Sequence, residues 1–193
     1  NEFVYHSGMI MKPVFSQARM APKRIVFAEG EDERVLRAVQ VVVDEGIAKP
    51  ILIGRHTEIK HQIEAAGLRI REGQDFEIVH AENCPFFDAH FDEFWQTYHG
   101  LTERKGISPD YARREVRRRA TLCGALMVHL GYADGLICGT FGRHEMHREY
   151  VESVIGTRAG HDRYYAMNLL MLPGRTVFIG DTYVNYDPSA EQL

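Results

Sequence analysis

The sequence has few cysteines, and they do not form a recognisable pattern. There are three, Cys84, Cys123 and Cys138, and no pair has CxxC spacing. An odd number without such spacing argues against a disulfide framework and against a zinc ribbon. Two of them lie within apolar stretches, where a small thiol is usually buried. We therefore expect a reducing environment and a cytoplasmic location.

The chain also lacks long apolar runs, a signal peptide and a strong net charge. No apolar run is long enough to span a bilayer, and residues 1–6 contain neither a methionine nor the regions of a signal peptide. Residue 1 is therefore expected to be an internal position of a longer polypeptide. The formal net charge of -4 favours neither nucleic acid nor an anionic membrane as a partner. A metabolite or another protein is the expected partner.

The first part of the chain alternates between strand and helix patterns. Short apolar runs at 25–28, 50–54 and 76–79 alternate with helical spacing at 35–43 and 59–66. This β-α-β-α-β order predicts an α/β fold, a mostly parallel sheet with helices on both faces. At 193 residues, the chain allows one domain or one lobe and part of another. Residues 1–22 are expected to form a connector, in which Pro13 separates an extended arm from a short helix.

Two further helical regions carry aromatic and basic residues. Phe91, Phe94, Trp95 and Tyr98 fall on one helical stripe, which favours a packed face over a stacking platform for an adenine ring. Residues 109–129 predict one long helix, basic in its first half. The arginines between 113 and 119 surround that helix, so a solvated face is the default, and binding of a polyanion is the alternative.

A glycine-bearing loop lies between a predicted strand at 135–138 and a helix from about 143 to 155. Free backbone N–H groups at a helix start form an anion site when glycines let a ligand approach. A tight strand-to-helix turn explains the loop equally well. The candidate acyl-CoA or anion-binding residues are Gly139, Thr140, Gly142, Arg143, His144, His147 and Arg148.

Metal binding and nucleophilic catalysis are weaker interpretations of the same stretch. His144 and His147 share a helix face, but the spacing is not HExxH and no third ligand lies nearby, so we expect no metal. Cys138 is a possible nucleophile, yet its place at the end of a buried strand favours a small core residue.

Three blocks, at 23–34, 133–140 and 180–193, join a short apolar run to a polar or glycine-bearing turn, the form of a buried strand that delivers functional groups at its carboxyl end. They resemble the phosphate acetyl/butyryltransferase family. The sequences of all three blocks are most similar to the phosphotransacetylase-like domain at the C-terminal end of large bacterial NADP-dependent malic enzymes. The resemblance covers 23–193. It implies an isocitrate-dehydrogenase-like phosphotransacetylase fold, with the first lobe and the beginning of the second, truncated at its C-terminal end.

The loop departs from the pattern of the family's active members. Those have a Ser-Gly pair and then a His-[Ser/Thr]-Thr-Ala-Asp-Thr-x-Arg-Pro segment. Here the pair is Cys138-Gly139, and residues 142–150 lack the hydroxyls, the aspartate and the Arg-Pro pair. The family's later catalytic half also lies beyond residue 193. We therefore expect no catalytic residues in this chain.

The resemblance implies a regulatory and oligomerisation domain that senses acetyl-CoA. The parent protein would be an NADP-dependent, oxaloacetate-decarboxylating malic enzyme that converts malate to pyruvate and CO2, with NADP and Mg or Mn in an upstream domain. Expected partners are a second copy of the chain, that upstream domain and acetyl-CoA. A catalytic phosphate acetyl- or butyryltransferase fragment that uses acyl phosphate and coenzyme A remains an alternative, and so does a purely structural oligomerisation module.

Overall fold

The computed structural model describes residues 2–82, 84–161, 163–172, 174–181, 184–186 and 188–190. The chain divides into two compact units. One contains residues 18–156, and the other contains residues 1–17 and 157–193. The candidate site lies in the first of them.

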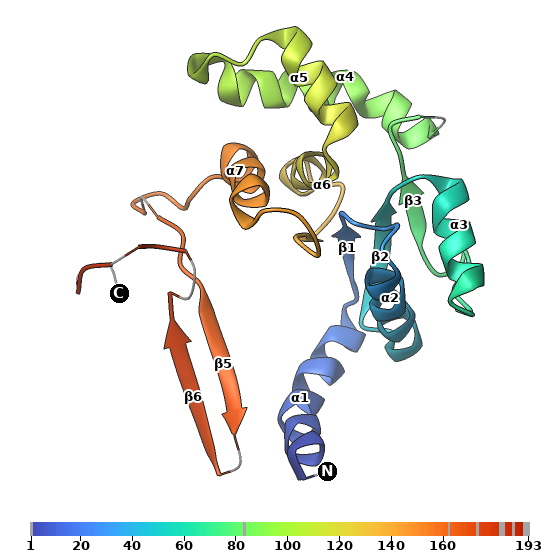
Figure 1. Cartoon of the computed structure of the whole chain (residues 1–193), viewed down its shortest axis with the longest axis vertical. Helices are drawn as coiled ribbons and strands as arrows, with labels where there is room; N and C mark the ends of the chain where they lie inside the picture. Colours follow the sequence, from blue (N-terminus) through green and yellow to red (C-terminus); the bar gives the residue numbers. More distant parts are fainter. Residues whose placement is uncertain are drawn as a thin grey trace. The chain divides into compact units, whose positions relative to one another are not determined.

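A four-stranded sheet organises residues 18–156. Its strands are β1 (Lys23–Phe27), β2 (Ala48–Ile53), β3 (Glu77–Val79) and β4 (Gly135–Ile137), in the order β3-β2-β1-β4. All three neighbouring pairs are parallel, so the carboxyl ends of the strands meet at one edge (Figure 1). The predicted parallel α/β sheet is therefore confirmed.

Each face of the sheet has its own apolar core, because neighbouring residues of a strand point to opposite faces. On one face Phe27, Leu52 and Ile78 pack with α2 (Glu33–Glu45) and α3 (His56–Ala65). On the other face the sheet residues belong to one core with three helices and with Val154 at the end of helix α7, and the short helix η1 completes the unit (Figure 1). The three helices are α4 (Pro85–Thr102), α5 (Pro109–Arg118) and α6 (Ala120–His129); α7 is His144–Val154 and η1 is Glu103–Lys105.

Helix α2 shows how local sequence fixes the edge of the sheet where the site lies. The Asp32 carboxylate caps the helix by accepting a hydrogen bond from the backbone N–H of Arg34. Gly46 ends it in the left-handed conformation, with φ 63°. Val35, Leu36 and Val39 bury one stripe against the sheet. The carboxyl end of β1 is thus joined to α2 by a short, capped turn.

The prediction of a single helix over 109–129 is wrong. The structure breaks it at Arg119, whose extended backbone (φ -115°, ψ 100°) separates α5 from α6. The break turns the chain, so that residues 121–127 of α6 are all buried while the basic side chains of α5 stay at the surface. Neither glycine nor proline stands at this position, so the sequence contains no breaker signal.

The first residues also differ from the extended arm and short helix that Pro13 predicts. They form one helix, α1 (Glu2–Met20), with Pro13 inside it. A proline removes one backbone hydrogen bond, but its fixed φ is close to the helical value, so turns can form on both sides of it. No helix in the described part of the chain is long and apolar enough to cross a membrane.

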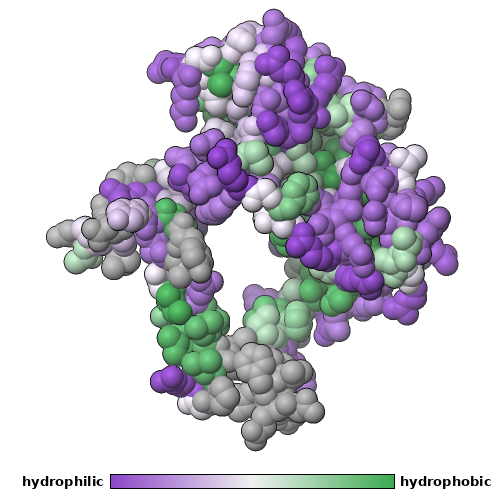
Figure 2. Space-filling model, in the orientation of Figure 1, coloured by the Kyte–Doolittle hydropathy of each residue, from purple (hydrophilic) through white to green (hydrophobic). Residues whose placement is uncertain are grey.

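The pattern of the block at 180–193 predicts a buried strand before its polar turn. The structure contradicts this prediction. Strands β5 (Met167–Leu172) and β6 (Arg175–Gly180) form an antiparallel hairpin in the second unit. Five of the six residues of β6 are exposed, and Figure 2 shows apolar side chains gathered on the hairpin. Antiparallel strands pair through a short turn, so this hairpin forms without joining a buried sheet. Residues 182, 183, 187 and 191–193 of the block lie outside the described residues.

Candidate functional site

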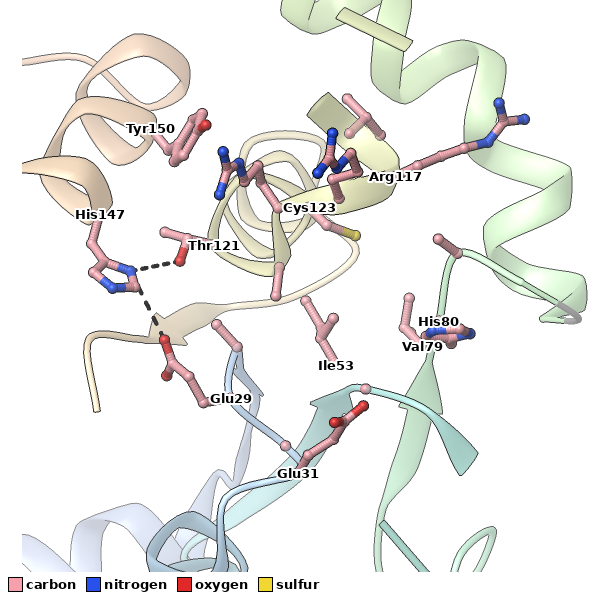
Figure 3. A pocket seen from close by; sticks show the side chains of 18 of the residues that line it. Glu29, Glu31, Ile53, Val79, His80, Arg117, Thr121, Cys123, His147 and Tyr150 are labelled. Atoms are coloured by element: carbon pink, nitrogen blue, oxygen red, sulfur yellow. Dashed lines mark hydrogen bonds and ion pairs between the residues drawn. The ribbon is translucent and has the colours of Figure 1, made fainter. Parts of the chain in front are cut away.

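A cavity of about 330 Å³ opens at the carboxyl ends of β1, β2 and β3. Ligand sites of parallel α/β sheets occur at this edge, because the loops there carry the side chains that the strands position. One side of the cavity is acidic and comes from the loop after β1. The other side is basic and comes from the junction of α5 and α6 (Figure 3). His147 and Tyr150 of α7 also line it.

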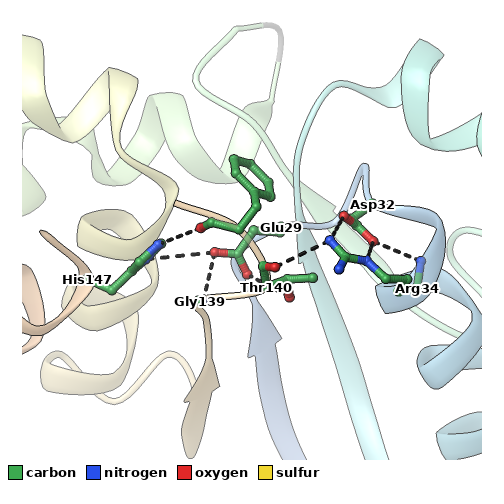
Figure 4. A network of polar contacts seen from close by, with 7 residues as sticks. Glu29, Asp32, Arg34, Gly139, Thr140 and His147 are labelled. Atoms are coloured by element: carbon green, nitrogen blue, oxygen red, sulfur yellow. Dashed lines mark hydrogen bonds and ion pairs between the residues drawn. The ribbon is translucent and has the colours of Figure 1, made fainter. Parts of the chain in front are cut away.

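Glu29 is the centre of the acidic side. Its carboxylate is buried and accepts hydrogen bonds from the backbone N–H of Gly139, at 3.0 Å, and from the hydroxyl of Thr140, at 3.5 Å (Figure 4). Gly139 has φ 94°, a conformation that glycine adopts without strain. The Glu29 carboxylate therefore accepts hydrogen bonds from Gly139 and Thr140, two residues that the sequence analysis predicts to bind an anionic ligand.

His147 connects the loop after β4 to helix α6. Its Nε2 lies 2.9 Å from the Phe141 carbonyl oxygen, which only accepts, so Nε2 carries a proton. Its Nδ1 lies 2.8 Å from the Thr121 hydroxyl and 3.9 Å from Glu29 Oε1. Both polar side chains approach the same ring nitrogen, while the other nitrogen is occupied. Both ring nitrogens of His147 are therefore engaged by groups of the protein.

Two further acids beside Glu29 are paired with arginines. Arg55 donates to both carboxylate oxygens of Glu31, and these hydrogen bonds are the main reason that the pKa of Glu31 is lowered. Arg34 pairs in the same way with Asp32 and lowers its pKa, and it also donates to the Thr140 carbonyl at 3.3 Å. Arg34 therefore joins Asp32 to the Thr140 and Glu29 contacts in one network (Figure 4).

The basic side contains Arg117, Arg118 and Arg119, and only Arg119 has an ion pair among the described residues. Arg119 Nε lies 3.2 Å from the buried carboxylate of Glu115, which also accepts from the Tyr150 hydroxyl at 2.6 Å. Burial, followed by this hydrogen bond, raises the pKa of Tyr150. Arg117 extends from α5 toward α4 (Figure 3), and its guanidinium lies over the Phe91 ring of that helix.

The structure brings together only part of the predicted site. Gly139, Thr140 and His147 converge on Glu29. Gly142 has φ 93° and lies against the His147 ring. Arg143, His144 and Arg148 are exposed and are not among the residues that line the cavity. Arg148 pairs with Glu152 along α7. A ligand contact for these three residues stays a prediction.

Sequence reasoning missed the contributions of Glu29 and Thr121 to the cavity, and it gave polyanion binding by the arginines between 113 and 119 only as the alternative to a solvated face. Glu29 lies two residues after the end of strand β1, and that position alone predicts a side chain at the functional edge of the sheet. Thr121 had no comparable signal, because its position depends on the break at Arg119. The aromatic partner of Arg117 was equally hidden, since it belongs to another helix.

The remaining candidate chemistry is weak. Cys138 is half-buried, and its pKa is raised chiefly by burial, so it is not activated as a nucleophile. Burial raises the pKa of Cys123, which lines the cavity, to about 12. Among the residues that the structure describes, no group of three or more His, Cys, Asp or Glu side chains is placed to hold a metal ion.

Comparisons with known proteins agree on one family. The family described as Phosphate acetyl/butaryl transferase matches residues 9–193. The whole chain is 48% identical to part of an NADP-dependent malic enzyme of Escherichia coli and spans 25% of that protein's length. A phosphate acetyltransferase of Nitratidesulfovibrio vulgaris is 32% identical over 93% of the chain, which spans 24% of that protein. The chain thus spans about a quarter of the length of these relatives.

Solved structures give the same result for the fold. A phosphotransacetylase from Streptococcus pyogenes superposes with a TM-score of 0.75 and 26% identity, over 94% of this chain and 54% of that one. A EutD phosphotransacetylase from Staphylococcus aureus has a TM-score of 0.76 at 21% identity, with the same coverage of both chains.

Proposed function

The chain belongs to the phosphate acetyl/butaryl transferase family, and from this premise we propose that it is the phosphotransacetylase-like domain of an NADP-dependent malic enzyme and that it senses acetyl-CoA. The proposal depends most on one observation. The cavity at the carboxyl edge of the sheet has a basic side on which Arg117 and Arg118 have no carboxylate partner among the described residues. Acyl-CoA carries several phosphates, which such arginines bind through charge-assisted hydrogen bonds.

We propose a regulatory and not a catalytic role for this domain, because the polar groups around Glu29 bond to one another. The Gly139 N–H and the Thr140 hydroxyl both donate to Glu29, and His147 uses both ring nitrogens within the protein. A phosphate acetyltransferase reaction would need donors for the acyl phosphate and a base for the coenzyme A thiol. We expect no acetyl-CoA synthesis from acetyl phosphate and coenzyme A. The parent's NADP and Mg or Mn belong to an upstream domain in this proposal, as does the oxidation of malate.

The hairpin supports a role in assembly. Leu169 and Phe178 are paired across β5 and β6 and are 45% and 63% exposed. Exposed apolar strands of this kind mark interaction surfaces, so we propose that copies of the chain associate through the hairpin. Replacing Leu169 and Phe178 together by Ser is expected to lower the mass measured by light scattering. An unchanged oligomer in the double variant would assign assembly to another surface.

Acetyl-CoA sensing is tested by calorimetry and by malate oxidation in the complete protein that contains this chain. Acetyl-CoA is expected to bind and to inhibit oxidation, because it favours one conformational state. Arg118→Ala, on the cavity, would remove a charge-assisted contact of roughly 1.5–3 kcal/mol, a tenfold or greater loss of affinity. Arg143→Ala makes the same change of charge outside the cavity lining.

The outcomes of this experiment separate the candidate sites. Loss of inhibition in Arg118→Ala alone assigns acetyl-CoA to the cavity. Loss in Arg143→Ala alone assigns it instead to the loop before α7. If acetyl-CoA neither binds nor inhibits the complete wild-type protein, the sensing role is wrong, and a purely structural module is the better description.

A further inference from the structure

Two arginines of α5 lie over two aromatic rings of α4. The guanidinium carbon of Arg113 is 3.8 Å from the centroid of the Trp95 ring, and that of Arg117 is 3.9 Å from the centroid of the Phe91 ring. Arg113 and Arg117 are four residues apart on α5, and their partners Trp95 and Phe91 are four residues apart on α4. The later arginine lies over the earlier ring. The two helices therefore run antiparallel and repeat the same pair after one turn. We call Phe91, Trp95, Arg113 and Arg117 the stacked-arginine face.

Both guanidinium groups are held in place without a strong anionic partner. Arg117 has no ion pair among the residues that the structure describes, and Arg113 pairs only with Asp110, whose side chain is 92% exposed. A highly exposed pair of this kind contributes little. Elsewhere, Arg34, Arg37, Arg55 and Arg69 all pair with carboxylates. Helix α5 therefore carries several arginines without a strong carboxylate partner among the described residues, although the chain has a net charge of -4.

The stacked-arginine face is continuous with the cavity. Phe87, one turn before Phe91 on α4, lines the cavity, and the two rings lie 5.6 Å apart. Arg117 belongs to both the face and the cavity wall (Figure 3), and Arg118, the next residue of α5, also lines the cavity. A ligand whose end lies in the cavity can extend along the face by one further helical turn, about 6 Å, to Arg113.

We propose that the stacked-arginine face binds the phosphorylated adenosine end of an acyl-CoA whose thioester end lies in the cavity. This proposal rests on the acetyl-CoA sensing proposed above. An aromatic ring covers one side of each guanidinium and fixes its plane, while the N–H edges can donate to phosphate oxygens. The uncovered side of a guanidinium offers a flat cationic surface on which adenine stacks.

Calorimetry with adenosine 3′,5′-bisphosphate and with acetyl-CoA tests the face on the whole chain. The variant Arg113→Gln with Arg117→Gln is expected to lose about tenfold in affinity for each arginine, and so about 100-fold for both ligands. Arg114→Gln is the matched control, because Arg114 lies on the same helix but its guanidinium carbon is over the ring of Tyr111 of that helix, 5.3 Å from the centroid, and it does not line the cavity. Its affinity is expected to change less than twofold.

Fluorescence gives a second measurement that needs no variant. Trp95 is the single tryptophan of the chain and lies under Arg113. Titration of the wild-type chain with adenosine 3′,5′-bisphosphate should therefore change its fluorescence, with the same dissociation constant as calorimetry. Acetyl-pantetheine, which lacks the nucleotide, should leave it unchanged.

Three results separate this proposal from the sensing role. If acetyl-CoA binds the wild type and the double variant equally, the face is not the subsite, and sensing stands. If adenosine 3′,5′-bisphosphate binds through both arginines while acetyl-CoA does not bind, the nucleotide subsite stands and acetyl-CoA sensing is wrong. If neither ligand binds or alters the fluorescence of Trp95, both proposals are overturned.

Discussion

The two sides of the cavity use charge in opposite ways. On the acidic side, Glu29, Glu31 and Asp32 all accept hydrogen bonds from nearby groups of the protein. On the basic side, Arg117 is stacked on an aromatic ring and Arg118 has no ion pair among the described residues. The acids hold three loops together, whereas these arginines remain able to bind an anion from solution.

This difference indicates which charges are structural and which are functional. Removing one member of a satisfied buried pair leaves its partner unsatisfied and lowers stability. Removing an exposed arginine changes stability little, because its charge is already solvated. Changes on the acidic side should therefore affect folding, and changes on the basic side should affect binding.

The largest effect is expected from Glu29→Ala. Loss of the buried carboxylate leaves the Gly139 N–H without its partner and opens a gap beside His147. We expect the free energy of unfolding to fall by about 3 kcal/mol, as measured by urea denaturation. Glu33→Ala is the control, since the ion pair of Glu33 with Arg37 is exposed on both sides. Equal losses in the two variants would contradict the structural role of Glu29.

A smaller effect is expected from Glu115→Gln, which tests whether the basic side also depends on a buried acid. The Glu115 carboxylate accepts from Tyr150 and Arg119, and its residue is only 5% exposed. A glutamine keeps the shape but loses a charge-assisted acceptor, so about 1.5 kcal/mol should be lost in urea denaturation. Asp110→Asn, at an exposed pair, should change stability by less than about 0.5 kcal/mol. A null result for Glu115→Gln would show that Arg119 is held by the backbone alone.

The sheet could be predicted from sequence because its signals are local. Apolar runs mark β1 to β4, and the Asp32 cap and Gly46 mark the ends of α2. The break at Arg119 was missed because the burial of α6 selects it, and no residue at that point disfavours a helix. The exposed hairpin was missed for a related reason: the apolar pattern of β6 is that of a buried strand, while its only paired strand in the described chain is β5.

The candidate site could be predicted only within one loop. Gly139 and Thr140 were identified because glycine and a hydroxyl after a strand have a recognisable chemistry. Their binding to Glu29 joins residues 110 and 111 positions apart, so it depends on the pairing of β1 with β4. The same applies to the stacking of Arg117 on Phe91, which requires two helices to be aligned.

A pH titration of stability should show the pairing of Glu31 with Arg55. The folded state lowers the pKa of Glu31 below its ordinary value of 4.5, chiefly through the side-chain hydrogen bond to Arg55. The pair therefore stabilises the protein fully above pH 4.5, and this contribution is lost as the pH falls through the lower, folded-state pKa. Wild-type stability should fall more steeply than that of Glu31→Gln between pH 5 and pH 3, by less than about 1 kcal/mol. Parallel pH profiles would show that the pair contributes nothing.

The last and smallest expected effect concerns the cysteine inside the cavity, away from its acidic and basic sides. Cys123 lines the cavity but is only 3% exposed, and burial raises its pKa to about 12. Since the thiolate is the reactive form, its reaction with Ellman's reagent at pH 8 should be at least roughly a hundredfold slower than that of a free thiol. Cys138, which is half-buried, should react faster, and Cys138→Ser should remove that faster phase without changing the slow one. Rapid labelling of Cys123 in the folded chain would show that the cavity opens to solvent on the timescale of the reaction. In that case its basic side would be mobile, and the fixed stacking of Arg117 would not describe the protein in solution.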